Sequence, residues 1–258
     1  MTTNYNDIAD DYQKTKEHPV KNYCEAFTFV QVLGDMAAKS ALDLACGDGF
    51  YKRLIKQHGA AEVIGVDLSE HMVNNARVIE EADPLGIEYR IGGATKLGIE
   101  YRVQDVADLE RMGRFDIALA VYLFPYATTR RQFSSTCRSI HRNLKPGGKL
   151  VAATFNPAVA EAELPGYRPY GVNLTTPTGL HDGAVIIASL DIPNGSVDLT
   201  AHYWSQETYE HTLTETGFQT ITWHPMQVPD EALQLYGRDY WQTYQRKSLD
   251  IVLACYKI

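Results

Sequence analysis

Residues 41–49 read Ala-Leu-Asp-Leu-Ala-Cys-Gly-Asp-Gly, and this stretch decides the fold. A short apolar run ends in small and acidic residues, and an amphipathic helical pattern follows at once over residues 50–58. A second apolar run ends in Asp67, eighteen residues after Gly49. A strand, a glycine turn, a helix and a second strand tipped by an acid form the layout of a nucleoside-binding βαβ unit. Gly47 and Gly49 allow the backbone to approach a ligand closely, and Asp67 can accept both hydroxyls of a ribose.

The glycine turn does not match a dinucleotide site. Such a site has a third glycine three residues after the second, for helix–strand packing and for pyrophosphate at the helix N-terminus. Lys52 stands at that position, and the acids Asp43 and Asp48 precede and interrupt the glycines. Two carboxylates repel a pyrophosphate, whereas they suit a ligand that carries an amine and a sulfonium.

The stretch Asp43-Leu44-Ala45-Cys46-Gly47-Asp48-Gly49 resembles the first motif, Asp-x-Gly-x-Gly-x-Gly, of the class I S-adenosylmethionine-dependent methyltransferases. Ala45 replaces the first glycine, and an alanine there needs only an allowed φ and a little room. The resemblance implies S-adenosylmethionine as cofactor and S-adenosylhomocysteine as product. The residues that it implies for this part of the cofactor site are Asp43, Ala45, Cys46, Gly47 and Gly49.

Further motifs of that family follow in order. Asp67-Leu68-Ser69 and Met72 match the second motif, in which the acid binds the ribose and apolar side chains flank the adenine. Residues 103–106 end a third strand, where the matching acid, Asp105, receives the adenine amino group. Residues 115–121 form a nearly all-apolar strand, as in a sheet buried on both faces, and residues 144–150 join a helix to a fifth strand. This part of the resemblance implies cofactor contacts from Asp67, Leu68, Met72, Gln104, Asp105, Val106 and Val121.

The predicted fold is α/β: a Rossmann-like, seven-stranded methyltransferase sheet with an antiparallel last strand and helices on both faces. We expect a single methyltransferase domain over residues 1–258. Residues 1–40 form a helical lid, 41–155 the cofactor-binding half, 156–203 a β-rich cap insertion, and 204–258 the C-terminal part of the core sheet. The lid pattern Tyr5-x-x-Ile8-Ala9-x-x-Tyr12 resembles one that folds over the methionine end of the cofactor, which makes Tyr12 a cofactor-site candidate.

A near-exact duplication lies before the expected third strand. Residues 85–90, Leu-Gly-Ile-Glu-Tyr-Arg, recur as residues 97–102. A period that occurs only twice does not build a solenoid. We expect the second copy to be the strand, because Asp105 must follow that strand directly, and the first copy to be a hairpin strand or a surface loop.

Composition excludes several classes of partner. The net charge of −8 argues against nucleic acid or an anionic membrane as the main partner, because phosphate is neutralised by clustered Lys and Arg. No apolar run approaches the ~18 residues of a membrane span, and the N-terminus has no apolar signal core. The four scattered cysteines form no CxxC pair, which predicts no metal site and a reducing cytoplasm. We expect a cytoplasmic monomer or homodimer.

The chemistry needs no enzyme nucleophile or metal, since positioning can supply about 7–11 kcal/mol of the barrier to an in-line displacement. Ligands bind beyond the carboxyl ends of the strands in open α/β sheets. Candidate proton acceptors or orienting groups are therefore Tyr122 and Tyr126 after the fourth strand and His202 in the cap, with His181 and Tyr203 beside it.

The acceptor class follows partly by exclusion. Residues 123–126, Leu-Phe-Pro-Tyr, lack the polar first residue and the first proline of the Asp/Asn/Ser-Pro-Pro-Tyr motif of nucleic-acid base methyltransferases. Aromatic residues in the lid, at the fourth-strand edge and in the cap suit a flat small molecule. The chain is similar to bacterial small-molecule N- and O-methyltransferases of secondary metabolism and, faintly, to azapteridine N-methyltransferases of toxoflavin-type compounds. The alternatives are a protein or RNA methyltransferase and a non-methylating nucleotide-binding Rossmann protein.

Overall fold

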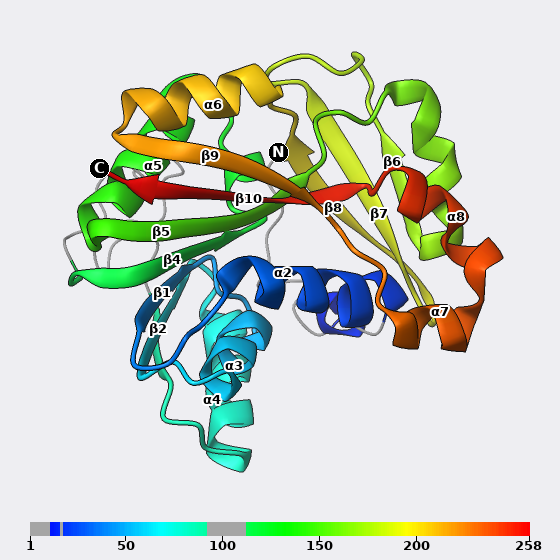
Figure 1. The fold of residues 1–258 in the computed structure, drawn as a ribbon. Coiled ribbons are helices and arrows are strands. Elements are labelled where there is room, and N and C mark those ends of the chain that lie inside the picture. Colours follow the sequence, from blue (N-terminus) through cyan, green and yellow to red (C-terminus); the bar gives the residue numbers. More distant parts are fainter. Residues whose placement is uncertain (1–10, 16–17, 92–111) are drawn as a thin grey trace.

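The computed structural model describes residues 11–15, 18–91 and 112–258. Its centre is a seven-stranded sheet in the order β3-β2-β1-β4-β5-β10-β9 (Figure 1). The strands are β1 (Ser40–Leu44), β2 (Glu62–Asp67), β3 (Glu88–Ile91), β4 (Phe115–Val121), β5 (Leu144–Phe155), β9 (Phe218–Pro225) and β10 (Asp250–Lys257). Strands β1 to β5 pair in parallel, and β10 runs antiparallel to both β5 and β9. The expected α/β sheet with an antiparallel last strand is confirmed.

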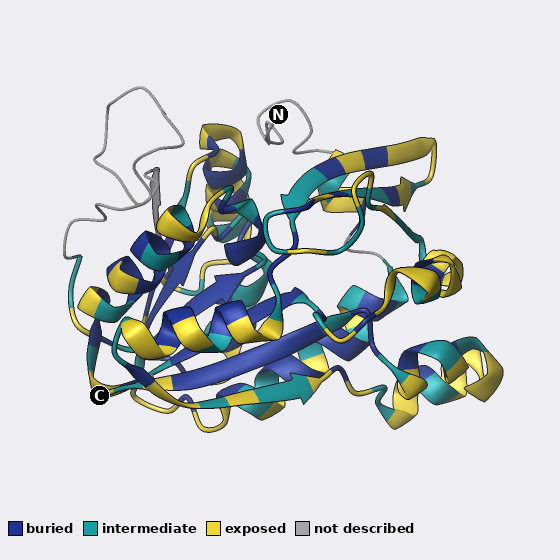
Figure 2. Cartoon of the chain, turned by 90° about the horizontal axis from the view of Figure 1, so that it is seen from above, coloured by how far each residue is buried: buried dark blue, intermediate teal, exposed yellow. Residues whose placement is uncertain are grey.

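Helices cover both faces of this sheet, as Figure 1 shows. One face carries α2 (Ala26–Leu33), α3 (Phe50–Gln57) and α4 (Glu70–Ala82), and the other carries α5 (Arg130–Asn143) and α6 (Gln206–Glu215). Alternate residues of β4 join the two cores: Ile117 and Leu119 pack with α2 and α3, whereas Ala118 and Ala120 pack with α5 and α6. Both faces of β4 are therefore buried, which explains its nearly continuous apolar sequence. Figure 2 shows these central strands in dark blue between helices with exposed outer faces.

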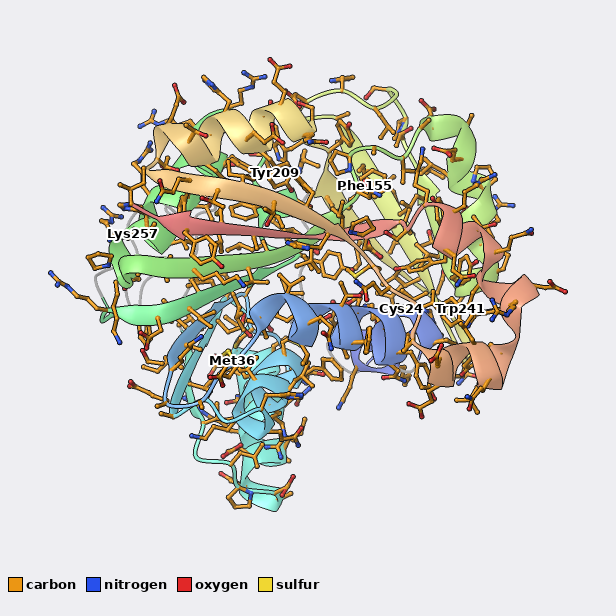
Figure 3. The ribbon with its side chains drawn as sticks, in the orientation of Figure 1. Cys24, Met36, Phe155, Tyr209, Trp241 and Lys257 are labelled. Carbon is orange, nitrogen blue, oxygen red and sulfur yellow. The ribbon has the colours of Figure 1, made fainter. Side chains whose placement is uncertain are left out.

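A second, three-stranded sheet lies between β5 and α6 in the chain. It consists of β6 (Val172–Thr175), β7 (Val185–Ile192) and β8 (Gly195–His202), all antiparallel, after the 3-10 helix η5 (Glu161–Tyr170). These three strands lie within residues 156–203, where a β-rich cap insertion was expected. Phe155, the last residue of β5, contacts the Tyr203 ring at 6.1 Å between centroids, so this sheet is packed against the carboxyl edge of the main sheet (Figure 3).

The third strand and the C-terminal helices differ from what the sequence predicted. The first copy of the duplicated sequence, not the second, forms β3, which pairs with β2 from Ile64↔Glu88 to Asp67↔Ile91. The prediction that the first copy is a hairpin strand or loop was wrong, and the second copy lies outside the described residues. Within residues 204–258, expected as the C-terminal part of the core sheet, two further helices occur, α7 (Asp230–Tyr236) and α8 (Arg238–Arg246), divided by Gly237, whose φ is 81°.

Before the first strand, the π-helix η2 (Val20–Glu25) continues directly into α2. Of the expected lid motif, only Tyr12 falls within the described residues. No helix in the described part of the chain is long and apolar enough to cross a membrane.

Candidate functional site

The glycine loop after β1 is built from residues with left-handed backbone. Ala45, Gly47 and Gly49 have φ values of 64°, 53° and 97°. The loop is held by the Cys46 N–H, which donates to the Val66 carbonyl at 3.0 Å, and by the Gly49 N–H, which donates to the Cys46 carbonyl at 3.1 Å. Glycine adopts this conformation readily, whereas an alanine in it is strained. Ala45 therefore adopts the same backbone region as the glycine that it replaces in the family motif, at some cost.

Asp67 fixes this loop from the neighbouring strand. Its Oδ2 accepts a hydrogen bond from the Gly47 N–H at 2.7 Å, and its Oδ1 accepts one from the Ser69 N–H at 2.8 Å. Burial raises the pKa of Asp67, and the hydrogen bonds from Ser69 and Gly47 oppose that rise. Ser69 then caps α4, because its Oγ accepts from the Met72 N–H at 3.1 Å. The acid, the loop and the next helix thus form one hydrogen-bonded unit.

Lys52 has a structural role that the sequence did not reveal. This side chain is fully buried, its Nζ lies 4.0 Å from Asp43 Oδ2, and it donates to the Cys46 carbonyl at 3.2 Å. Its chain passes directly over Gly65, where an added Cβ would lie 2.3 Å from Lys52 Cδ. The residue that breaks the dinucleotide fingerprint is therefore a buried cation that compensates the acids beneath the loop.

Asp43 and Asp67 lie on one face of two neighbouring strands. Asp43 is in register with Gly65, and Asp67 is two residues further along β2, so all three positions face the side covered by α2, α3 and α4. Val121 ends β4, next to β1, on the same face. Gln104, Asp105 and Val106 lie outside the described residues, so the third acid of the expected set stays a prediction.

A cavity of about 870 Å³, open space at its mouth included, lies beside this region between the main sheet and the cap sheet. We call it the cap cavity. Its lining brings together Tyr12, Tyr122, Tyr126 and His202, four of the residues that the sequence singled out. Neither Asp43 nor Asp67 lines it. Of the other candidates, His181 is exposed, and Tyr203 is buried and donates to the Pro157 carbonyl at 3.0 Å, so neither reaches the cavity.

The two candidates nearest the strand end have unusual local features. Tyr122 directly follows β4 with a φ of 52°, and its N–H donates to the Ala153 carbonyl at 2.8 Å. A bulky residue in this backbone region is strained by roughly 1–3 kcal/mol, and such strain clusters at functional sites. His202 ends β8, and its Nδ1 is buried with no hydrogen-bond partner among the described residues. Burial lowers the pKa of His202, and a hydrogen bond to the Pro125 carbonyl opposes that effect.

Sequence reasoning missed two acids of the cap cavity, Glu25 and Asp250. Glu25 ends η2, and Asp250 begins β10. Because β10 is antiparallel, it begins at the edge where the parallel strands end. The acid at the start of the last strand could therefore have been predicted to lie at the site from the sequence. The amphipathic pattern around Glu25 gave no such indication.

The loop and its surroundings fit a nucleoside with a cationic tail. A Cβ added to Gly47 would meet no heavy atom of the described residues within 4 Å, so the loop borders open space. Leu68, beside the acid at the end of β2, is 47% exposed, an apolar surface suited to a purine. Cys46 is not a nucleophile, because burial raises its pKa to about 12.

Comparison with known proteins agrees with this geometry. Residues 41–148 match the family described as a methyltransferase domain. Residues 41–148 therefore carry a methyltransferase domain. S-adenosylmethionine is its cofactor, and the assignment of Asp43, Gly47, Asp67 and Leu68 to its binding stays a prediction.

Individual relatives of this methyltransferase are distant. A ubiquinone biosynthesis O-methyltransferase of Coxiella burnetii is 28% identical over 199 residues, which cover 74% of this chain and 70% of the relative. An uncharacterised protein of Haemophilus influenzae is 29% identical over 148 residues, and the match spans only 54% of that protein. The crystal structure of an S-adenosylmethionine-dependent methyltransferase from Clostridium acetobutylicum covers 98% of both chains with a TM-score of 0.61 at 15% identity, which shows the shared fold.

Proposed function

We propose that this enzyme methylates a nitrogen or oxygen atom of a small, flat, aromatic or heteroaromatic metabolite that binds in the cap cavity. The observation that carries the proposal is the cavity itself. Most of the side chains that line it are apolar or aromatic, as is typical of small-molecule sites. Aromatic side chains of Tyr126, Phe155 and Tyr170 line it together with aliphatic side chains from the cap strands, such as Ile186 and Leu199. Such a lining favours a flat apolar molecule over a peptide or a nucleic acid.

The position of the cavity supports the same proposal. Tyr122 follows the central strand β4 and lines the cavity, so the cavity begins at the carboxyl edge of the sheet, where the glycine loop also lies. S-adenosylmethionine, when bound, supplies an electrophilic methyl group. The residues of the chain have to bind the acceptor, exclude water and remove a proton where the acceptor carries one. The apolar cap strands serve the first two tasks.

For proton removal from an O–H or N–H group, His202 is the proposed acceptor in the cap. Its low pKa keeps the ring neutral at pH 7, and the hydrogen bond to the Pro125 carbonyl assigns the ring proton to Nε2. Nδ1 then carries a lone pair that no described residue uses. Tyr122 and Tyr126, which also line the cavity, are the proposed orienting groups.

The experiment supplies the purified protein with S-adenosylmethionine bearing a deuterated methyl group and with separate metabolite, protein and RNA fractions of a bacterial extract. We expect a mass label in the metabolite fraction, on an aromatic compound, and a lower rate of labelling with His202→Ala. An Asp198→Ala variant is the matched control, because Asp198 is exposed on the same strand β8 and does not line the cavity. Label confined to protein or RNA refutes the proposal.

A further inference from the structure

Two acids form one end of the cap cavity, and the proposed function gives them no role. Glu25 is 2% exposed, and its carboxylate accepts hydrogen bonds from the Tyr51 hydroxyl and, at 2.6 Å, from the Tyr122 hydroxyl. Tyr51 belongs to the helix after the glycine loop, and Tyr122 follows β4. Glu25 therefore lies where the cofactor loop and the cavity meet. We call Glu25 and Asp250 the acid pair.

Asp250 lines the same cavity and interacts electrostatically with Glu25. Burial, followed by the negative charge of Glu25, raises the pKa of Asp250 to about 8, and Lys21 and the Tyr122 hydroxyl oppose that rise. The titratable groups that face Asp250 come from the N-terminal helices, the strand tip and the cap: Lys21, Glu25, Tyr51, Tyr122, Tyr167 and Tyr244. Two carboxyls in one apolar site do not both ionise readily, and the raised pKa of Asp250 leaves Asp250 mainly protonated near neutral pH.

One observation points to a ligand in this cavity: Nδ1 of His202, which lines it, is buried and has no hydrogen-bond partner among the described residues. A buried tyrosine also lies near the acid pair, outside the lining of the cavity. The Tyr244 side chain is 1% exposed, its hydroxyl interacts with Asp250 and Glu25, and it has no hydrogen-bond partner among the residues described. A buried hydroxyl without a partner costs about 1–3 kcal/mol. Among the described residues, the cation named as facing Asp250 is Lys21. Its Nζ also donates to the Thr15 hydroxyl at 3.3 Å and lies 4.9 Å from the centroid of the Tyr12 ring. Two acids and one lysine leave the site able to accept one further positive charge.

We propose that the acid pair binds the amino group of the methyl acceptor, so that the acceptor is a basic amine on an apolar, aromatic frame. For such an amine, Asp250 takes the place of His202 as the proton acceptor. This inference rests on the proposed function and narrows it to amine N-methylation. The acceptor enters as an ammonium ion, which binds between the two carboxyls. One N–H bond breaks, the proton passes to a carboxylate oxygen of Asp250, and the bonding pair stays on nitrogen. The neutral amine can then form the N–C bond while the C–S bond of the donor breaks and its electron pair remains on sulfur.

The test uses three probes of equal shape and different charge: 2-phenylethylamine, 2-phenylethanol and phenylacetate. Binding to the full chain is measured at pH 7 by calorimetry without cofactor, in phosphate and in Tris, whose different ionisation enthalpies report protons released. We expect the amine to bind at least tenfold more tightly than the alcohol and phenylacetate to bind least. Up to one proton should be released for each amine bound, because a bound cation displaces the proton that Asp250 holds.

Variants separate the possible outcomes. Asp250→Asn, which keeps the side-chain shape, should abolish proton release and the preference for the amine while leaving S-adenosylhomocysteine affinity within threefold of wild type. Glu25→Gln should also lose the preference, and the exposed Asp198→Asn should keep it. Equal affinity for amine and alcohol, or an unchanged preference in Asp250→Asn, overturns the inference alone. If the acid-pair variants lose S-adenosylhomocysteine binding but keep the preference for the amine, the acid pair belongs to the cofactor site, and the inference is also overturned. If none of the three probes binds, the proposed small-molecule function fails as well.

Discussion

Replacing Gly65 by alanine tests how the glycine loop is supported. The added Cβ would lie 2.3 Å from Lys52 Cδ, 2.4 Å from Nζ and 2.6 Å from Cε. All three distances are far shorter than any real carbon contact, so the lysine side chain must leave its position. Its ammonium would then lose Asp43, at 4.0 Å, and the Cys46 carbonyl, at 3.2 Å.

The expected cost follows from the buried ion pair. Removing one partner of such a pair typically destabilises a protein by about 3–5 kcal/mol, because a buried charge is left uncompensated. The glycine-to-alanine change itself returns about 0.4–1 kcal/mol by restricting the unfolded chain. We therefore expect the free energy of unfolding of Gly65→Ala to fall by about 2–4 kcal/mol, a large part of the 5–15 kcal/mol typical of a domain.

Urea unfolding followed by circular dichroism measures this change. Gly166→Ala is the matched control, because a Cβ there would meet its nearest neighbour, Thr243 Cγ2, at 3.4 Å, an ordinary contact. In the double variant Gly65→Ala/Lys52→Ala, the shortened side chain leaves room for the new Cβ. The double variant should therefore be no less stable than Lys52→Ala alone. A Gly65→Ala protein within 1 kcal/mol of wild type, or additive costs in the double variant, would refute the role assigned to Lys52.

Three further changes have defined outcomes. Ala45→Gly should raise the free energy of unfolding by about 0.5–1 kcal/mol. An alanine with left-handed backbone costs about 1–2 kcal/mol, and the greater conformational entropy of glycine in the unfolded chain offsets part of the stabilisation. A urea midpoint lower than that of wild type contradicts this expectation. Hydrogen bonds from Lys145 and Ser40 outweigh burial and lower the pKa of Asp116 from 3.8 to about 2. Its contribution of about 2 kcal/mol is therefore present above pH 4 and lost as the pH falls toward 2. Asp116→Asn should lose less stability than wild type over that interval, and equal losses in the two proteins argue against the assignment. Tyr122→Phe removes a donor from buried Glu25 and should lower the free energy of unfolding by about 1.5–3 kcal/mol; a neutral result would show that this hydrogen bond does not support the acid.

Most of the main sheet could be read from the sequence because its strands carry local signals. The buried run 115–121 is apolar on both faces, and the acid at the end of β2 sits beside the glycine loop because parallel register places it there. The third strand could not be assigned locally. Both copies of Leu-Gly-Ile-Glu-Tyr-Arg have the same propensity, and pairing with β2, a long-range contact, selects the first copy.

Some residues of the candidate site could be predicted from the sequence, and others could not. Tyr122, Tyr126 and His202 were found because each lies in or near a strand end that topology brings to one edge. Lys52 was taken as a break in a motif, since a sequence does not show that this lysine is buried against Asp43 on the preceding strand, β1. Glu25 and Asp250 are 225 positions apart, and only the antiparallel entry of β10 brings them into one cavity.

Calorimetric titration with S-adenosylhomocysteine and with NADH tests the cofactor site most directly. The account predicts saturable binding of S-adenosylhomocysteine by the wild-type protein and no binding of NADH. Asp67→Ala should weaken S-adenosylhomocysteine binding at least a hundredfold, because hydrogen bonds to a charged carboxylate contribute about 1.5–3 kcal/mol each, while Asp198→Ala should bind as wild type does. Near-wild-type affinity in Asp67→Ala, or binding of NADH in place of S-adenosylhomocysteine, would contradict the assignment of the loop and its acid to the methyl donor.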